Sequence, residues 1–484
     1  MPSKKGKLAQ NAAIYSLFTL LQRGLGFFLL PVYTVFLSTD QLGIISTSTA
    51  IISFMVILFG LSFRGATTYY YYEYKDEKPT YLKKILGTSV STILLATLFG
   101  IAFLLTTKQW ILDPLFENID FYPYVILALI SIFLQPLYFF YQSLLKAKQQ
   151  AKKASLLDFT YFGVMIGGTL FLILVLGFKA EGALLANAVA SFCAFVWSVI
   201  GLRKQITFGI NLVVLKKLLK YSMPLLPHNL SGWAMNMVDR VMLNLMESLS
   251  FVALFDVGSQ LGKLVNIISL GVNSAFAPWF FEQVKNDENS KTNIARVSER
   301  IVILYVAIAI CISWLAPELL TLISAPTYYE SWKVVPIIAM AFVANGFYFS
   351  FSSVFFLEKT KYLPILTLFG AFVNIVLNFF LIKSYGFMGA AYASIITKIF
   401  FTSITYFVSQ RLFYIPYRII RIGIWFALGA MACFSPYIYQ DWLNQFEFLW
   451  VIFLKCVILG IFVGIAIFRN RNSIRLLLQK RQGA

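Results

Sequence analysis

The segment Tyr221–Asn244, YSMPLLPHNLSGWAMNMVDRVMLN, decides how the rest of this sequence is interpreted. It is rich in amide and charged side chains and contains the only histidine, His228, yet long apolar runs lie on both sides of it. An ionised side chain at the centre of a bilayer costs at least ~2.5–3.5 kcal/mol. If the segment spans a membrane, its polar groups must therefore face a wet cavity or one another. We take it as the candidate functional centre.

The composition places the chain among membrane proteins. Of its 484 residues, 59% are hydrophobic and 13% are charged, whereas soluble domains have roughly 25% charged residues. The first apolar run, residues 11–37, is too long for a cleavable signal and has no small-residue cleavage site, so we expect it to be retained. Four cysteines, Cys193, Cys311, Cys433 and Cys456, lie in apolar runs without paired spacing. This predicts neither disulfides nor a zinc site.

Apolar stretches of about 20 residues, the length that crosses a bilayer, predict fourteen spans and an all-α polytopic membrane protein. The expected spans are 11–37, 42–65, 84–106, 121–144, 155–177, 182–202, 221–246, 250–281, 298–324, 332–356, 363–383, 388–410, 418–438 and 447–468.

Basic residues alternate between successive loops and predict the topology. Most of the 40 Lys and Arg residues lie on one side, which includes both termini. The other side has few basic residues, and we expect its loops to carry acids such as Asp113, Glu318 and Asp441. The positive-inside rule makes both termini cytoplasmic. These loops account for the net charge of +19, so no nucleic-acid partner is expected.

Two pairs of similar segments indicate an internal repeat. FRGATTYYYYEYK (63–75) resembles VNSAFAPWFFEQVK (272–285), and GFKAEGALLANA from Gly177 parallels YGFMGAAYAS from Tyr385. Six predicted spans separate the equivalents, which indicates parallel six-helix lobes with a site between them. The predicted units are 1–204, 205–411 and a 412–484 unit with two further helices and a basic tail. Chance similarity is the alternative, since each match is short.

Charged residues inside the predicted spans define the candidate site. Helical periodicity places polar and basic residues on one face of the first, second, seventh and eighth spans, and we expect these faces to line one central cavity. An excess of cations suits a phosphate or pyrophosphate ligand. The substrate-binding candidates are Arg23, Arg64, Arg240, Lys263, Asn236 and Gln260.

Alternatives remain for several of these residues. Arg240 is also expected to pair internally with Asp256, and Arg64 is near enough to a span end to reach the interface. Asp239, Asp256 and His228 are candidates for ion coupling or structural pairing. Two further basic residues, Lys398 and Lys455, are expected in interfacial or packing positions. Neither catalytic residues nor a metal site nor a cofactor is expected.

Three stretches carry a family resemblance. They are KKGKLAQNAAIYSLFTLLQRGLGFFLLPVYTVFLSTDQLGI, the central segment with the following FDVGSQLGKLVNIISLGVNSAFAPWFFE, and GFMGAAYAS. The chain resembles the bacterial lipid-linked oligosaccharide flippases, the polysaccharide transporter family of the multidrug/oligosaccharidyl-lipid/polysaccharide exporter superfamily. The resemblance implies that a polyprenyl-pyrophosphate-linked oligosaccharide is moved from the inner to the outer leaflet of the bacterial cytoplasmic membrane by alternating access.

The resemblance also implies roles and partners. Related flippases contact the lipid pyrophosphate with cations in the first, second and eighth spans, which here contain Arg23, Arg64 and Lys263. The product would serve capsule, O-antigen or exopolysaccharide synthesis, with a polysaccharide polymerase, glycosyltransferases and membrane lipid as partners and a Na⁺ or H⁺ gradient as the driving force. One alternative is a cation-coupled multidrug antiporter of the same superfamily. Such antiporters are expected to use acidic residues in the cavity of the first lobe. Here only Asp158 lies inside or beside a predicted span of that lobe, which disfavours this alternative. The other is a non-transporting scaffold of a polysaccharide-assembly complex.

Overall fold

A computed structural model describes residues 27–284, 289–358, 362–443, 445–446, 448, 450–455, 457–458 and 460. Arg23 and most of the first predicted span lie outside the described residues. In the first part of the chain the helices are α2 (Leu30–Phe36), α3 (Thr39–Phe59), α4 (Phe63–Tyr74), α5 (Pro79–Thr106), α6 (Leu112–Leu115), α7 (Ile126–Ala147), α8 (Ala151–Leu170) and α9 (Ala180–Leu202).

The second part continues with further helices. They are α10 (Leu212–Ser222), α11 (Leu225–Met246), α12 (Leu249–Gly262), α13 (Leu264–Val284), α14 (Asn289–Ile323), α15 (Val334–Ser352), α16 (Phe355–Glu358), α17 (Tyr362–Leu412), α18 (Ile419–Phe434) and α19 (Pro436–Leu443).

Ten helical stretches among the described residues are long and apolar enough to cross a membrane. The polar α11 is a further helix of 22 residues, and α17 contains two predicted spans that meet at Gly386, whose φ of 56° and ψ of −135° interrupt the helix. Large apolar side chains such as Phe99, Phe192 and Phe372 are exposed on the outer faces, as expected of a surface in contact with lipid. The predicted all-α, multi-pass membrane fold is confirmed.

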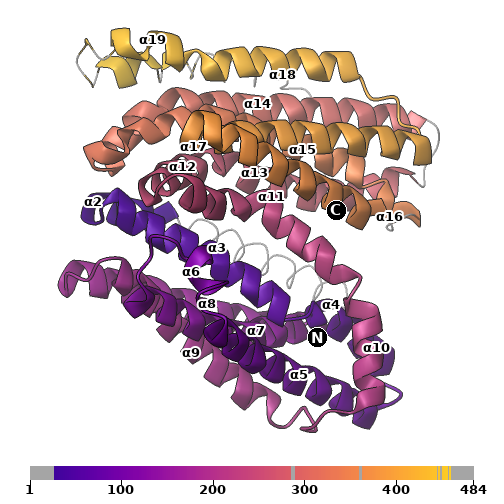
Figure 1. The fold of residues 1–484 in the computed structure, drawn as a ribbon. Coiled ribbons are helices and arrows are strands. Elements are labelled where there is room, and N and C mark those ends of the chain that lie inside the picture. The colour runs from indigo at the N-terminus through magenta and orange to yellow at the C-terminus, as the bar shows by residue number, and fades with distance from the viewer. Residues whose placement is uncertain are drawn as a thin grey trace.

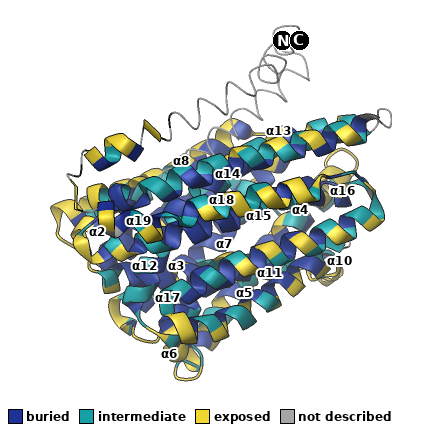
Figure 2. Ribbon diagram, turned by 90° about the horizontal axis from the view of Figure 1, so that it is seen from above, coloured by how far each residue is buried: buried dark blue, intermediate teal, exposed yellow. Residues whose placement is uncertain are grey.

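The helices form two groups joined by α3, α11 and α12 (Figure 1). In the first group, α7 packs against α4, α5, α8 and α9; in the second, α17 packs against α11 and α15, and α14 against α15 and α18. Contacts of α3 with α11 and α12 connect the groups. Residues of α3 and α7 are mostly buried, whereas α18 has many exposed positions (Figure 2). The predicted boundaries at 204 and 411 stay a prediction.

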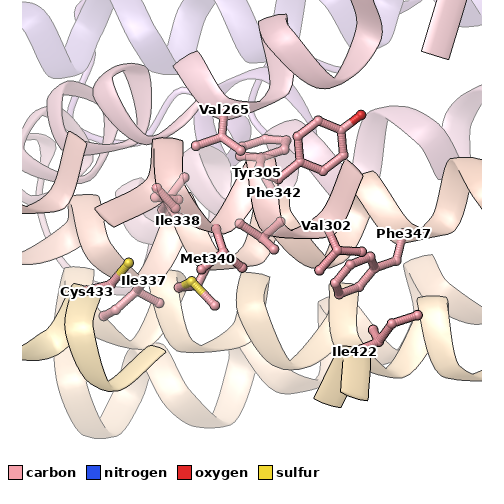
Figure 3. Packing of buried hydrophobic residues seen from close by; sticks show 14 of the residues in the cluster. Val265, Val302, Tyr305, Ile337, Ile338, Met340, Phe342, Phe347, Ile422 and Cys433 are labelled. Carbon is pink, nitrogen blue, oxygen red and sulfur yellow. The ribbon is translucent and has the colours of Figure 1, made fainter. Parts of the chain in front are cut away.

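The largest apolar cluster lies in the second group. Side chains from α13, α14, α15 and α18 point toward one another, among them Val265, Tyr305, Met340 and Cys433 (Figure 3). Nearly all of α15 is buried, because neighbouring helices surround it. This packing gives the second group a rigid frame against which α11, α12 and α17 hold their polar residues.

The second and eighth predicted spans are not continuous helices, which corrects the sequence-based prediction. The second stops at Phe59, and Leu61 and Ser62 adopt φ values of 50° and 54°. Such left-handed residues cost roughly 1–2 kcal/mol each, and the Ser62 hydroxyl accepts a hydrogen bond of 2.9 Å from the Asn229 amide. The eighth breaks at Lys263, between α12 and α13. Arg64 consequently lies on a separate helix, α4.

Two glycines next to or inside helices adopt positive φ values. Gly177 precedes α9 with a φ of 68°, and Gly386 interrupts α17 with a φ of 56°. Glycine adopts this conformation without the steric penalty of a Cβ atom. The internal repeat stays a prediction.

We use two names for the ends of the helix bundle. The basic end is where Lys75, Lys148 and Lys217 lie, and the acidic end is where Asp113 and Glu330 lie. The junction between α11 and α12, at Glu247, lies at the acidic end. The start of α3 lies there too.

Candidate functional site

Helices α11, α12 and α17 bring five charged residues together. Asp239 and Arg240 come from α11, Asp256 from α12, Lys263 from the break after α12, and Lys398 from α17. All except Asp256 line a small, partly open space of about 20 Å³, which is little more than one water molecule needs. We call these five charged residues the charge cluster.

Arg240 makes an ion pair with Asp256. Its Nη2 and Nε atoms donate to Asp256 Oδ1 at 2.6 and 3.0 Å, and its Nη1 donates to the Asn236 carbonyl at 3.0 Å. The guanidinium also lies over the Phe255 ring, 5.1 Å from its centre. Because a buried charge is tolerated only when it is paired and hydrogen-bonded, these contacts explain how Arg240 stays within the helix bundle. The geometry is that of the internal pair considered from the sequence.

Asp256 connects the two groups of helices. Its Oδ2 atom accepts a 2.8 Å hydrogen bond from the Ser46 hydroxyl of α3 and a 3.2 Å hydrogen bond from Gln260. The same carboxylate thus touches α3, α11 and α12.

Asp239 has a separate set of partners on α17. Asn378 donates to its Oδ1 at 2.8 Å, and Ser394 donates to Oδ2 at 3.4 Å. Arg240 Nη1 lies 3.9 Å away. Lys398 interacts with Asp239 electrostatically, and its Nζ lies 4.8 Å from the centre of the Phe342 ring. Asp239 therefore ties α11 to α17.

Lys398 is buried beside Asp239. It is therefore not interfacial and has a packing position, one of the two placements expected for it. Asn378, which donates to Asp239, was not singled out from the sequence. No acid stands at helical spacing from Lys398, so the only signal in the sequence was a lysine within an apolar run.

Asn236 lines the same space as the charge cluster, and its amide donates to the Gly232 carbonyl at 2.7 Å. The remaining candidates lie in different places. His228 Nδ1 is 2.7 Å from the Thr367 hydroxyl, near the start of α11. Arg64 is exposed on α4, with its guanidinium carbon 5.2 Å from the centre of the Phe139 ring, and it lines a different pocket from the charge cluster. Arg23 lies outside the described residues.

A second buried ion pair corrects the placement of Glu318. Lys455 Nζ donates to Glu318 Oε1 at 2.6 Å, and both side chains are buried. Glu318 lies within α14 and not in a loop. Lys455 also donates to Gln440 at 3.0 Å. Lys455 is thus a packing residue, one of the two placements expected for it, and it holds the C-terminal part of the chain to α14.

Asp158, the buried acid of the first group, is held by neutral donors. The Tyr138 hydroxyl donates to its Oδ1 at 2.7 Å, and the Gln142 amide contacts both oxygens at 2.7 and 2.8 Å. These bonds join α8 to α7.

Comparison with known proteins assigns the family. Residues 8–284, more than half of the chain, match the family described as polysaccharide biosynthesis protein. The chain belongs to this family. It is also 25% identical to protein 1 of the Lsg locus of Haemophilus influenzae over 323 residues, which cover 64% of this chain and 75% of that protein.

Two solved structures share the fold of this family member. The lipid II flippase MurJ, in an inward closed conformation, matches with a TM-score of 0.76 and 16% identity, covering 96% of this chain and 100% of that chain. An inward-facing multidrug resistance MATE family transporter of the MOP superfamily matches with a TM-score of 0.61 and 16% identity, covering 83% and 95%. At these identities the similarity establishes a common fold.

Proposed function

We propose that this protein is a flippase that moves a polyprenyl-pyrophosphate-linked oligosaccharide from the inner to the outer leaflet of the bacterial cytoplasmic membrane. Membership of the polysaccharide biosynthesis family and the fold shared with the lipid II flippase support a lipid-linked substrate. The observation that carries the proposal is the charge cluster, in which Arg240, Lys263 and Lys398 outnumber Asp239 and Asp256 where the two groups of helices meet.

Competition for Arg240 supplies a mechanism for alternating access. A pyrophosphate offers several anionic oxygens, and a guanidinium can hold two of them at once. When these oxygens bind Arg240 and Lys263, Asp256 loses its main partner. The carboxylate is then left without a cation at the contact between α12 and α3, where Ser46 donates to it. Binding of the anion is thereby coupled to separation of the two groups at the acidic end.

A charged headgroup in hydrocarbon would be strongly unfavourable, and the cations of the cluster offset this. The prenyl chain would stay in the surrounding lipid.

Leaflet transfer tests the proposal directly. Liposomes containing the purified protein and a fluorescent polyprenyl-pyrophosphate-linked saccharide are treated with an impermeant quencher, and the rate at which label moves between leaflets is measured. The Arg23→Ala plus Lys263→Ala variant should transfer at least about tenfold more slowly, since one charged hydrogen bond is worth roughly 1.5–3 kcal/mol. Lys333→Ala, an exposed lysine at the acidic end, is the matched control. Normal transfer by the double variant would refute the anionic site.

The shared fold with the multidrug transporter favours one second candidate. A cation-coupled exporter would move organic cations out of loaded liposomes under a Na⁺ or H⁺ gradient, and Asp239→Asn or Asp256→Asn would stop it. The flippase proposal expects no such efflux. A scaffold of a polysaccharide-assembly complex would transfer neither substrate, and charge changes in the cluster would then have no effect on polymer production.

A further inference from the structure

A shallow, open pocket of about 740 Å³ lies at the basic end, separate from the charge cluster. Its walls come from α4, from Ser143 of α7 and from Tyr221 of α10. We call it the tyrosine pocket, after Tyr69, Tyr72 and Tyr221 in its lining.

The four consecutive tyrosines of α4 do not all face the same way. Tyr70 is buried, and Lys217 of α10 lies over its ring at 4.9 Å. Tyr69 and Tyr72, one helical turn apart, line the pocket and remain 50% and 48% exposed. The inner face of α4 thus provides packing, while its outer face presents two half-exposed aromatic rings. Each ring has one neighbour in the fold: Tyr69 stacks on Tyr221, and the Lys75 Nζ lies 5.1 Å from the centre of the Tyr72 ring.

One of these rings is fixed in place. Tyr69 stacks on Tyr221, with 4.9 Å between ring centres and 26° between planes. One face of Tyr69 is occupied by this contact, and the other face is available. Gly65 permits the close approach, because a Cβ atom there would lie 3.3 Å from Leu225 of α11 and 4.0 Å from Tyr221.

Charged contacts hold the pocket walls together. Lys217 of α10 lies 3.5 Å from Glu73 of α4 and donates a hydrogen bond to the Tyr74 hydroxyl. That hydrogen bond raises the pKa of Lys217 above its ordinary value, so the lysine stays charged at neutral pH. Tyr221 also belongs to α10. The contacts of Lys217 with α4 therefore hold both walls of the pocket in place before any ligand binds.

Arg64 supplies an anion-binding group at the same site. Its guanidinium rests near the Phe139 ring, and none of the ion pairs within the described part of the chain involves it. A guanidinium has five N–H donors in a planar arrangement that suits phosphate oxygens. The pocket therefore combines aromatic faces, hydroxyls and an unpaired cation.

We infer that the tyrosine pocket binds the sugar of the lipid-linked substrate, with pyranose C–H groups against Tyr69 and Tyr72 and the adjoining phosphate near Arg64. An aromatic face carries negative partial charge and attracts the weakly positive C–H groups of a sugar ring. The Ser143 and Glu73 side chains offer hydrogen-bonding partners to sugar hydroxyls. This inference rests on the proposed flippase function and specifies where the glycan is recognised at the basic end.

Binding of two defined lipids to the full-length protein in nanodiscs separates sugar from phosphate recognition. The probes are polyprenyl pyrophosphate and the same lipid bearing one N-acetylhexosamine. Wild-type protein should bind the glycosylated lipid about tenfold more tightly, which corresponds to about 1.4 kcal/mol. The Tyr69→Leu plus Tyr72→Leu variant should lose this ratio and retain its affinity for the sugar-free lipid, which also shows that it is folded.

Two further variants sharpen the comparison. Tyr69→Phe plus Tyr72→Phe keeps the aromatic faces and should keep the ratio, and Tyr414→Leu, an exposed tyrosine at the basic end of the second group, is the matched control. Arg64→Gln should weaken binding of both lipids to the same extent.

Equal binding of the two lipids by wild-type protein would overturn the inference. So would an unchanged ratio in the leucine variant, or an equal loss of affinity for both lipids, which would make the tyrosines membrane anchors. A different result would contradict the proposed function but not this inference: wild-type protein would bind the lipids in a sugar-dependent manner and transfer no lipid between leaflets.

Discussion

Replacing Arg240 by methionine should destabilise the protein more than replacing its partner Asp256 by asparagine. The guanidinium and the carboxylate are 3% and 13% exposed, with 2.6 Å between their nearest atoms. Charges about 4 Å apart attract by about 4 kcal/mol at an effective dielectric constant of 20, and removing one partner of a buried pair costs about 3–5 kcal/mol.

The surroundings of the ion pair determine which of the two substitutions lowers the free energy of unfolding more. In the Asp256→Asn variant, Arg240 still has Asp239 at 3.9 Å, so we expect a loss near the lower limit, about 3 kcal/mol. In the Arg240→Met variant, Asp239 and Asp256 both lose their guanidinium partner, so we expect a loss near the upper limit, about 5 kcal/mol. The double variant should lose less than the sum, with a coupling energy of at least about 2 kcal/mol.

Equilibrium unfolding in mixed detergent micelles measures these free energies. The control is the half-exposed pair of Lys108 and Asp113, 3.8 Å apart, for which Lys108→Met and Asp113→Asn should show a coupling below about 1 kcal/mol. Additive losses in the Arg240 and Asp256 cycle, within about 0.5 kcal/mol, would refute the argument that this pair is a tightly coupled buried unit.

Two further changes test other contacts. Gly43→Ala places a Cβ atom 2.1 Å from a backbone carbonyl oxygen of α12, so α3 and α12 should separate at the acidic end. The hydroxyls of residues 39 and 250 lie 2.7 Å apart. The distance between spin labels at these two positions should therefore increase. Lys455→Met leaves Glu318 buried without its cation and should lower the free energy of unfolding by about 3–5 kcal/mol, as measured in the same micelles.

Each of these changes has its own control. Gly423→Ala introduces a Cβ atom with no neighbour within 4 Å and should leave the spin-label distance unchanged. If Gly43→Ala also left this distance unchanged, the helices would absorb the clash locally and the prediction would be wrong. Lys108→Met removes a half-exposed partner of Asp113 and should cost less than about 1 kcal/mol. An equally small loss for Lys455→Met would show that the C-terminal contact with α14 contributes little.

Local features of the sequence were sufficient for the fold class. Apolar length predicts membrane helices because each helix satisfies its own backbone hydrogen bonds and needs only about 20 apolar residues to cross a bilayer. Helical periodicity likewise placed Arg240 and Asp239 on the polar face of the seventh span. The pairing of Arg240 with Asp256 was within reach because the two helices are adjacent in the chain.

Helix breaks were harder to anticipate. Leu61 and Ser62 adopt left-handed conformations that their residue types do not favour. The Asn229 amide contacts the Ser62 hydroxyl from a distant part of the chain. A break stabilised by such a partner has no local signature, so the second span was predicted as one helix and Arg64 as part of it.

By itself, the sequence determined that this chain is a bundle of membrane helices with basic residues at one end and a polar seventh span. Only the tertiary structure decided that Lys398 lies beside Asp239, that Lys455 neutralises Glu318, and that the charge cluster surrounds one small space. The physical reason is that hydropathy acts along one helix, whereas a buried charge is stabilised by whichever helix packs against it. Helix packing depends on the shapes of many side chains together, so Tyr221–Asn244 shows its polar face in the sequence and its partners only in the fold.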